Sequence, residues 1–310
     1  MKIVLLGAAG QLGQQLQRSL APLGELVALT RHGLAGPSAP AQPLLCGDLG
    51  QAQALAGTLR ALRPDVIVNA AAYTDVERAE TEPGAAHRIN GQACALLAEQ
   101  AQALGAVLLH FSSDYVFGHG SERPWRETDA CLPLNHYGLS KLEGERAIAQ
   151  HCSRYWIVRS SWLYEAGSRN FLSTVLAAAL AGTPLRITSD QCGAPTRAAW
   201  LAQVAAQILA APHALPAGLY HASASGHTTW HGYALFALAQ AQSLGAALPL
   251  LPAQIEPITA QARGGARRPA NSRLDTTLLQ ARLHITPPPW QRGVQDVVRQ
   301  WVRDLHAARV

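Results

Sequence analysis

The sequence predicts an α/β fold built on a doubly wound parallel sheet, with a smaller, mixed lobe attached to it. Short, wholly apolar runs alternate with segments of helical spacing through the first half of the chain. Such runs are typical of strands that are buried on both faces of a parallel sheet. A glycine-rich turn directly follows the first run, and after about residue 165 the alternation loosens and prolines cluster.

The first half alternates strands with helices. We expect strands at residues 3–6, 26–29, 66–68, 107–111 and 156–159. We expect the intervening helices at residues 11–20, 55–62, 85–104 and 139–150, with Gly105 ending the third of them. In the second half, helices are expected at 171–180, 200–209 and 233–244, and a strand at 219–222.

The composition excludes several classes of protein. Of the 310 residues, 48% are apolar and 15% charged, which excludes a disordered chain, a coiled coil and a collagen-like fibre. The net charge of +5 includes no dense basic run, so nucleic acid is not expected as a partner. Five cysteines without a CxxC pair indicate reduced thiols rather than disulfides or a zinc site. No apolar stretch is long enough to cross a membrane, so we expect a cytoplasmic protein.

The first motif is the turn Gly7-Ala8-Ala9-Gly10-Gln11-Leu12-Gly13. Glycines there let the backbone approach a pyrophosphate, which then binds at the N-terminus of the following helix. We therefore expect a dinucleotide at this turn, with an ordinary tight turn as the alternative.

The end of the second strand bears on the choice of dinucleotide. A carboxylate at this position would bind the ribose hydroxyls of NAD, but the chain has Thr30 and Arg31 instead. Because Arg31 can pair with a 2′-phosphate, the sequence favours NADP. The alternative is a solvated Arg31 and the use of both cofactors.

The second motif is Tyr137-Gly138-Leu139-Ser140-Lys141. A spacing of four on a helix places the phenol and the ammonium on one face, where we expect the cation to lower the phenol pKa. A tyrosine so tuned can exchange a proton with a substrate near neutral pH. Ser113 follows the strand 107–111, at the carboxyl end where parallel sheets bind their ligands. Its hydroxyl can bond the phenol or a substrate carbonyl.

In these motifs the chain resembles the extended short-chain dehydrogenase/reductases and, within them, the dTDP-4-dehydrorhamnose reductase family. The resemblance covers essentially the whole chain. It rests on GAAGQLG from Gly7, RPDVIVNAAAYTDVERAE from Arg63, SSDYVFG from Ser112, LNHYGLSKLEGE from Leu134, RSSWLY from Arg159, SDQCGAPT from Ser189, TTWHGYA from Thr228 and RRPANSRLD from Arg267. It implies a Rossmann-type NADP-binding domain over residues 1–165 with roughly 195–225. Residues from roughly 166–194 and 226–310 would form the lobe that binds the nucleotide sugar.

The resemblance also implies an activity and its residues. The family reduces the C4 ketone of dTDP-4-dehydro-β-L-rhamnose to dTDP-β-L-rhamnose with NADPH or NADH, the last step of dTDP-L-rhamnose biosynthesis. Tyr137 would donate a proton to the C4 oxygen, and Lys141 would lower the pKa of Tyr137 and hold the nicotinamide ribose. Ser113 would orient the phenol from a position where the family usually carries threonine. The cofactor would contact Gly7, Gly10, Gln11, Leu12, Gly13, Thr30, Arg31, Asp48, Leu49, Ala70, Ala71, Ala72, Tyr137 and Lys141. The dTDP-sugar would contact Ser113, Asp114, Trp162, Arg268 and Asn271.

Two departures from the family pattern matter. Relatives with NADH activity carry an aspartate where Thr30 stands, so its absence strengthens the preference for NADP. Some members dimerise through magnesium held by glutamates, one of them in the first helix, where this chain has Gln15. A bridging magnesium ion is therefore not expected, which leaves a homodimer open.

Alternatives stay open beside the main hypothesis. One is another nucleotide-sugar reductase or epimerase, since substrate choice depends on the second lobe. Another is a non-catalytic NADP-binding regulatory subunit, which is less favoured because Ser113, Tyr137 and Lys141 are all present. For Trp162 the alternative is packing, and for Arg268 and Asn271 it is a loop that joins the two lobes.

Overall fold

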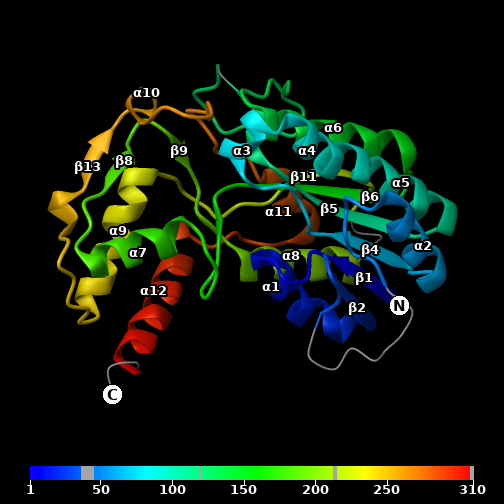
Figure 1. Cartoon of the computed structure of the whole chain (residues 1–310), viewed down its shortest axis with the longest axis horizontal. Helices are drawn as coiled ribbons and strands as arrows, with labels where there is room; N and C mark the ends of the chain where they lie inside the picture. Colours follow the sequence, from blue (N-terminus) through cyan, green and yellow to red (C-terminus); the bar gives the residue numbers. More distant parts are fainter. Residues whose placement is uncertain (36–44, 119, 212–214, 308–310) are drawn as a thin grey trace.

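The computed structural model describes residues 1–35, 45–118, 120–211 and 215–307 (Figure 1). Its central sheet has seven strands in the order β11-β6-β5-β4-β1-β2-β3. All neighbouring strands pair in parallel except β2 and β3, which form a hairpin. The strands are β1 (Lys2–Leu6), β2 (Glu25–Thr30), β3 (Gly33–Leu34), β4 (Val66–Asn69), β5 (Val107–Ser113), β6 (Tyr155–Ser160) and β11 (Gly218–His221). The predicted doubly wound α/β fold is confirmed, with a strand at each of the six predicted places.

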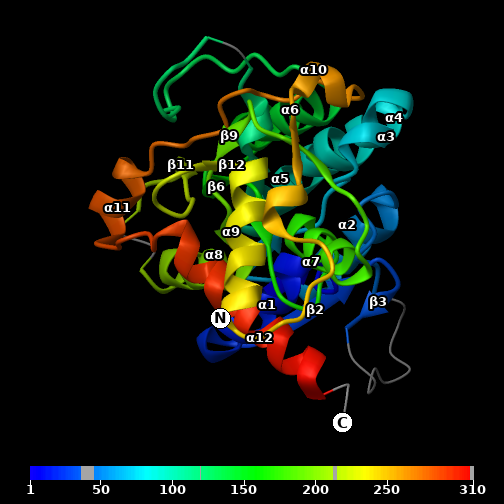
Figure 2. The same cartoon turned by 90° about the vertical axis from the view of Figure 1, so that its left-hand side faces the viewer.

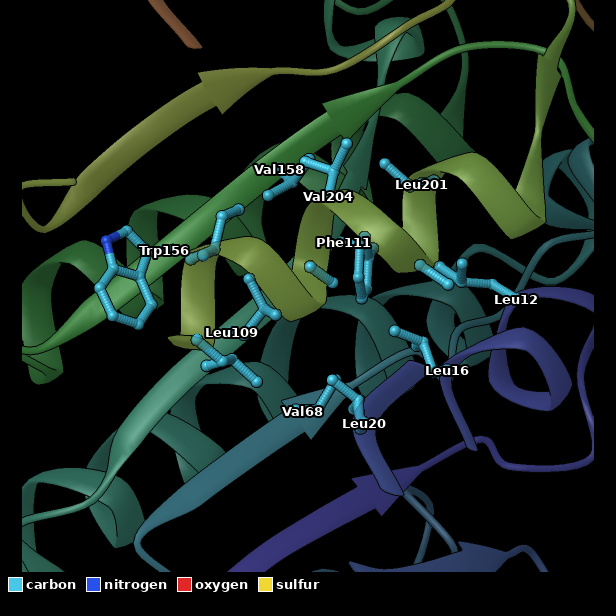
Figure 3. Close-up of a cluster of buried hydrophobic side chains, with 14 of the residues drawn as sticks. Leu12, Leu16, Leu20, Val68, Leu109, Phe111, Trp156, Val158, Leu201 and Val204 are labelled. Atoms are coloured by element: carbon cyan, nitrogen blue, oxygen red, sulfur yellow. The ribbon is translucent and has the colours of Figure 1, made fainter. Parts of the chain in front are cut away.

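Helices cover both faces of the sheet (Figures 1 and 2). Successive side chains of β1 alternate between the faces, as the pleat requires. Ile3 and Leu5 pack in one core and Val4 and Leu6 in the other. The first core lies under α1 (Gln11–Leu20), α8 (Ala198–Ala210) and α11 (Thr277–Leu283), and Figure 3 shows α1 and α8 over the strands. The second lies under α2 (Ala52–Leu62), α5 (Ala93–Leu104) and α6 (His136–His151).

The remaining elements build a second, smaller core at the left of Figure 1. It lies between α7 (Phe171–Ala181), α9 (Trp230–Ser243) and α12 (Trp290–Ala307). Three two-stranded pairs accompany it: β7 (Leu163–Tyr164) with β10 (Thr196–Arg197), β8 (Arg186–Thr188) with β13 (Glu256–Ile258), and β9 (Cys192–Gly193) with β12 (Thr228–Thr229). The short helices of the described chain are α3 (Val76–Thr81), α4 (Pro83–Ala86), α10 (Ala260–Arg263) and the 3₁₀ turns Ala21–Leu23, Asp114–Val116 and Pro252–Gln254.

Two helical segments differ from the prediction. The helix predicted at 85–104 begins at Pro83 and contains a π-helical segment, His87–Gln92, before α5, although it does end at Gly105. The 18-residue helix α12 was not predicted. Its buried valines, Val294, Val298 and Val302, recur every four residues, but the prolines at 287–289 just before it suggest an irregular segment.

Helix α6 packs unusually close to its neighbours because two glycines face them. A Cβ at Gly138 would lie 2.9 Å from the carbonyl carbon of Tyr115 and closer still to its oxygen. A Cβ at Gly144 would lie 3.2 Å from the Cys94 sulfur and would clash with the Asn90 carbonyl. On the same helix, Glu145 forms a buried ion pair with Arg159 of β6, with Nε and Oε1 2.8 Å apart. The two glycines fix the distance from α6 to the turn after β5 and to the helical segment 87–104, and the ion pair fixes its distance from β6.

We predict that Gly144→Ala destabilises the protein, although alanine is the better helix former. Overpacking against backbone should lower the free energy of unfolding by about 1–3 kcal/mol, measured by urea denaturation. The matched control is Gly57→Ala in α2, where a Cβ would contact nothing within 4 Å. Gly57→Ala should stabilise by about 0.5–1 kcal/mol. Equal effects of the two substitutions would show that α6 does not need this close approach.

Candidate active site

The carboxyl ends of the parallel strands bring the predicted residues to one edge of the sheet. The glycine-rich turn follows β1, Arg31 follows β2, Ala70 follows β4, and Ser113 ends β5. This edge is where open parallel sheets bind ligands.

The turn after β1 fits the pyrophosphate of a dinucleotide. Gly7 has a φ of +79°, and a Cβ there would lie 2.6 Å from the Ala71 nitrogen, so the turn lies directly against the segment after β4. A Cβ at Gly13 would lie 2.8 Å from the Cα of Ala8. Gly10 precedes α1, and no side chain caps this helix end. The backbone N–H groups at the start of α1 are therefore available to an anion.

The two side chains after Gly10 point in different directions. Leu12 is buried in the core, so only its backbone can face a pyrophosphate. The Gln11 side chain extends away from the turn, and its Nε2 donates to the Leu163 carbonyl of β7 at 3.0 Å. Its Oε1 accepts from Asn170 at 2.9 Å, and the Asn170 side chain also caps α7. Gln11 thus joins the glycine-rich turn to the second lobe.

Arg31 occupies the tip of the β2–β3 hairpin. Thr30 and Gly33 pair across the hairpin, and the Thr30 hydroxyl donates to the Gly33 carbonyl at 3.0 Å. Thr30 thus shapes the turn that presents Arg31, whose side chain is exposed. Nearby in sequence, Asp48 accepts from the Gly50 N–H at 2.9 Å, and Leu49 is buried. An exposed cation at this strand end can reach a 2′-phosphate.

Ser113, Tyr137 and Asp114 gather at the end of β5. Burial raises the pKa of Tyr137 to about 12, against a lowering influence of its hydrogen bond with Ser113. The expectation that Lys141 lowers this pKa is therefore not met. The Ser113 hydroxyl also donates to Asp114 Oδ1 at 3.0 Å. Burial raises the pKa of Asp114 to about 7, and its Oδ2 has no hydrogen-bond partner among the described residues.

Lys141 lies one helical turn after Tyr137 on α6, and its side chain is only 2% exposed. Its Nζ donates to the Phe111 carbonyl at 2.8 Å and lies 3.2 Å from Nε2 of His110. These contacts direct the amine toward β5, which explains why Lys141 does not dominate the pKa of Tyr137. Burial lowers the pKa of Lys141.

A cleft of about 520 Å³ lies next to this group, between the sheet and the second lobe. Its lining residues are Thr74, Val76, Tyr115, Phe171, Arg186, Ile187, Thr188, Gln191, Trp230, Arg263 and Arg268. Three arginines and three aromatic rings in one cleft suit a ligand that combines phosphates with flat rings. Sequence reasoning missed most of these residues, because they come from separate segments with no shared motif.

The structure separates the predicted substrate residues. Arg268 lines the cleft, and its guanidinium contacts Glu77 of α3 at 2.8 Å. Trp162 does not line the cleft but stacks on Trp230, with ring centroids 3.6 Å apart, so it supports one wall. Its φ of +48° is strained for a non-glycine residue.

Asn271 lies outside the lining of this cleft. Its Nδ2 donates to the carbonyls of Ser121 and Arg123, and its Oδ1 accepts from Arg273. Through these hydrogen bonds the Asn271 side chain holds the loop 121–125 in place.

Gln15 stands where some members of the family carry a glutamate ligand of magnesium, and its side chain does not suit a metal. Gln15 of α1 offers a neutral amide, whose oxygen accepts from Arg18 at 3.4 Å. Within the described ranges, no three His, Cys, Asp or Glu side chains are grouped to hold a metal ion. Nor does any helix there have the length and apolar character needed to span a membrane.

Comparison with known proteins identifies the family. The model of the RmlD substrate binding domain matches residues 1–303. The chain is 42% identical over 302 residues to a dTDP-4-dehydrorhamnose reductase of Shigella flexneri, which covers 97% of this chain and 98% of that relative.

Solved structures of such reductases have the same fold. The Bacillus anthracis enzyme, solved in complex with NADP, has a TM-score of 0.85 at 27% identity, covering 96% of this chain and 99% of that chain. The Clostridium acetobutylicum protein has a TM-score of 0.86 at 26% identity, covering 97% and 99%. The chain therefore belongs to the dTDP-4-dehydrorhamnose reductase family of the short-chain dehydrogenase/reductases.

Proposed function

We propose that this protein reduces the C4 ketone of dTDP-4-dehydro-β-L-rhamnose to dTDP-β-L-rhamnose, with NADPH as the preferred reductant. The observation that carries the proposal is the 42% identity to a curated reductase over nearly the whole of both chains. The arrangement of Ser113, Tyr137 and Lys141 beside a cleft lined with arginines supports it.

The dihydronicotinamide, when bound, supplies a hydride to C4. Tyr137 donates its phenolic proton to the C4 oxygen as negative charge develops there. A pKa of about 12 keeps the phenol protonated at neutral pH, so it is ready to donate. Ser113 orients the phenol through their hydrogen bond, and the buried Asp114 carboxyl in turn accepts from the Ser113 hydroxyl.

Each half of the protein has its own ligand in this proposal. The sheet domain, residues 1–165 with roughly 195–225, holds the cofactor along the turn after β1 and Arg31. The second lobe, roughly 166–194 and 226–310 apart from α11, which packs on the sheet, holds the nucleotide sugar. Arg186, Arg263 and Arg268 line the cleft where the diphosphate would lie, because guanidinium groups pair well with phosphate oxygens.

The direct test is to supply the purified protein with dTDP-4-dehydro-L-rhamnose, generated in situ by the enzymes that precede it. We expect oxidation of NADPH coupled to formation of dTDP-L-rhamnose, identified by chromatography. Binding of NADPH without turnover would favour another ketosugar or a regulatory subunit, and would contradict the proposal.

Tyr137→Phe should lower kcat by about 10²- to 10⁴-fold, the usual contribution of a general acid. The affinity for NADPH, measured by fluorescence titration, should change little because only a hydroxyl is removed. Tyr155→Phe is the matched control, since Tyr155 lies at the opposite end of β6 from the site. Near-normal turnover of the Tyr137→Phe enzyme would exclude Tyr137 as the proton donor.

Arg31→Ala should raise the KM for NADPH by about 10- to 100-fold, which corresponds to the free energy that a hydrogen bond to a charged group contributes. The KM for NADH should hardly change, because NADH lacks the 2′-phosphate. Arg60→Ala, an exposed arginine on α2, serves as the control. An equal rise of the KM for NADPH and of the KM for NADH would show that Arg31 does not select between the two cofactors.

Removal of divalent metal should leave activity intact, because Gln15 offers no carboxylate at the position of the magnesium ligand. We expect the enzyme dialysed against EDTA to keep its kcat and its sedimentation behaviour. A loss of turnover or a change of oligomeric state that magnesium restores would contradict this prediction.

A further inference from the structure

A chain of buried polar groups lies behind Lys141 and has no part in the mechanism above. His110 of β5 is 1% exposed, and Asn69 at the end of β4 is equally buried. The Asn69 Nδ2 lies 3.1 Å from Nδ1 of His110, and Nε2 of the same ring lies 3.2 Å from Nζ of Lys141. A histidine that bridges two polar groups in the core has a defined tautomer, which the neighbouring donors determine.

The orientation of Asn69 determines that tautomer. The Ala71 N–H donates to Oδ1 of Asn69 at 3.1 Å, so the amide nitrogen must be the atom that faces His110. An amide nitrogen only donates, and therefore Nδ1 of His110 accepts. The neutral ring then carries its hydrogen on Nε2. Burial, together with the charge of Lys141, holds the pKa of His110 well below its ordinary value, so the ring is neutral.

The hydrogen on Nε2 points at the amine of Lys141. An ammonium has three donors and no acceptor, whereas a neutral amine has a lone pair that can accept this hydrogen. The Nζ donates to the Phe111 carbonyl in either state. His110 therefore stabilises the neutral amine relative to the ammonium. The other titratable groups near the pair are Cys94, whose sulfur lies 3.9 Å from Nδ1, and Glu145 on α6; both raise the pKa of Lys141.

We propose that His110 is a positioning residue whose Nε2–H stabilises the neutral amine of Lys141, so that Lys141 can change its charge one helical turn from Tyr137. This inference rests on the function proposed above. C4 gains the hydride and its oxygen gains the phenolic proton, which leaves Tyr137 as a phenolate. The phenolate then regains a proton from solvent, while Lys141 keeps its contacts with His110 and the Phe111 carbonyl. His110 itself keeps one protonation state throughout.

The chain permits a direct test, because Lys2 and Lys141 are its only lysines. In protein labelled with ¹³C-lysine, the two side-chain signals can be assigned with a Lys2→Arg variant, and the pKa of Lys141 can be read by NMR titration. In His110→Gln, the amide oxygen can accept from an ammonium, so the pKa of Lys141 should rise by about one unit or more. The alkaline limb of the kcat–pH profile should move to higher pH together with the pKa of Lys141.

Cys152→Ala is the matched control, since Cys152 is a buried thiol of the same core that contacts the Arg154 carbonyl and neither His110 nor Lys141. It should leave the alkaline limb where it is in the unaltered enzyme. An unchanged or lowered pKa of Lys141 in His110→Gln would overturn the proposal.

A second measurement needs no variant. The ¹⁵N spectrum of imidazole-labelled protein should show His110 with its hydrogen on Nε2, and a hydrogen on Nδ1 would overturn the proposal even if His110→Gln fails to fold. Both NMR readings are made without turnover. If they agree with the proposal while no dTDP-L-rhamnose forms, the proposed reaction fails and the effect of His110 on Lys141 stands.

Discussion

The close packing of α6 against the turn after β5 and against the helical segment 87–104 is the constraint on which the proposed reaction centre depends. Gly138 and Gly144 lie one turn before and one turn after Lys141, and each lets the helix approach a backbone carbonyl that a side chain would block. The pair of Glu145 and Arg159 holds the same helix to β6 from within the core. Removing either partner would leave a buried charge without compensation, which is strongly unfavourable. Tyr137 and Lys141 are consequently fixed relative to Ser113 by packing along the whole helix, not by contacts within the site alone.

A second set of contacts joins the two lobes. Gln11 extends from the glycine-rich turn to Leu163 and Asn170, so the cofactor turn and the start of α7 share hydrogen bonds. Across the cleft, Glu77 of α3 pairs with Arg263 and Arg268, which belong to the other lobe. Both walls of the cleft are therefore positioned by side chains that cross between the lobes. A substitution in one lobe can consequently alter the binding of the ligand held by the other.

The interior of the site disfavours charge. Burial raises the pKa of Asp114 to about 7 and that of Tyr137 to about 12, while it lowers the pKa of Lys141 and of His110. Every one of these shifts favours the neutral form, because the low-dielectric interior penalises the charged one. The arginines of the cleft are farther out, where a diphosphate would need them. Such a separation suits a proton transfer between nearly neutral groups beside a strongly charged anchor for the substrate.

The sequence by itself determined the layers of the fold and where the proposed catalytic residues lie on its elements, because both depend on local patterns. Apolar runs and helical spacing are properties of neighbouring residues, and Gly7 to Gly13, Ser113 and the Tyr137–Lys141 pair lie at strand or helix ends that these patterns locate. Only the tertiary structure decided what each side chain faces. It places Leu12 in the core, Trp162 behind Trp230 and the Asn271 side chain against the loop 121–125, and it turns Lys141 toward His110. These contacts join residues far apart in the chain, and their distances follow from how the elements pack, which no local pattern records.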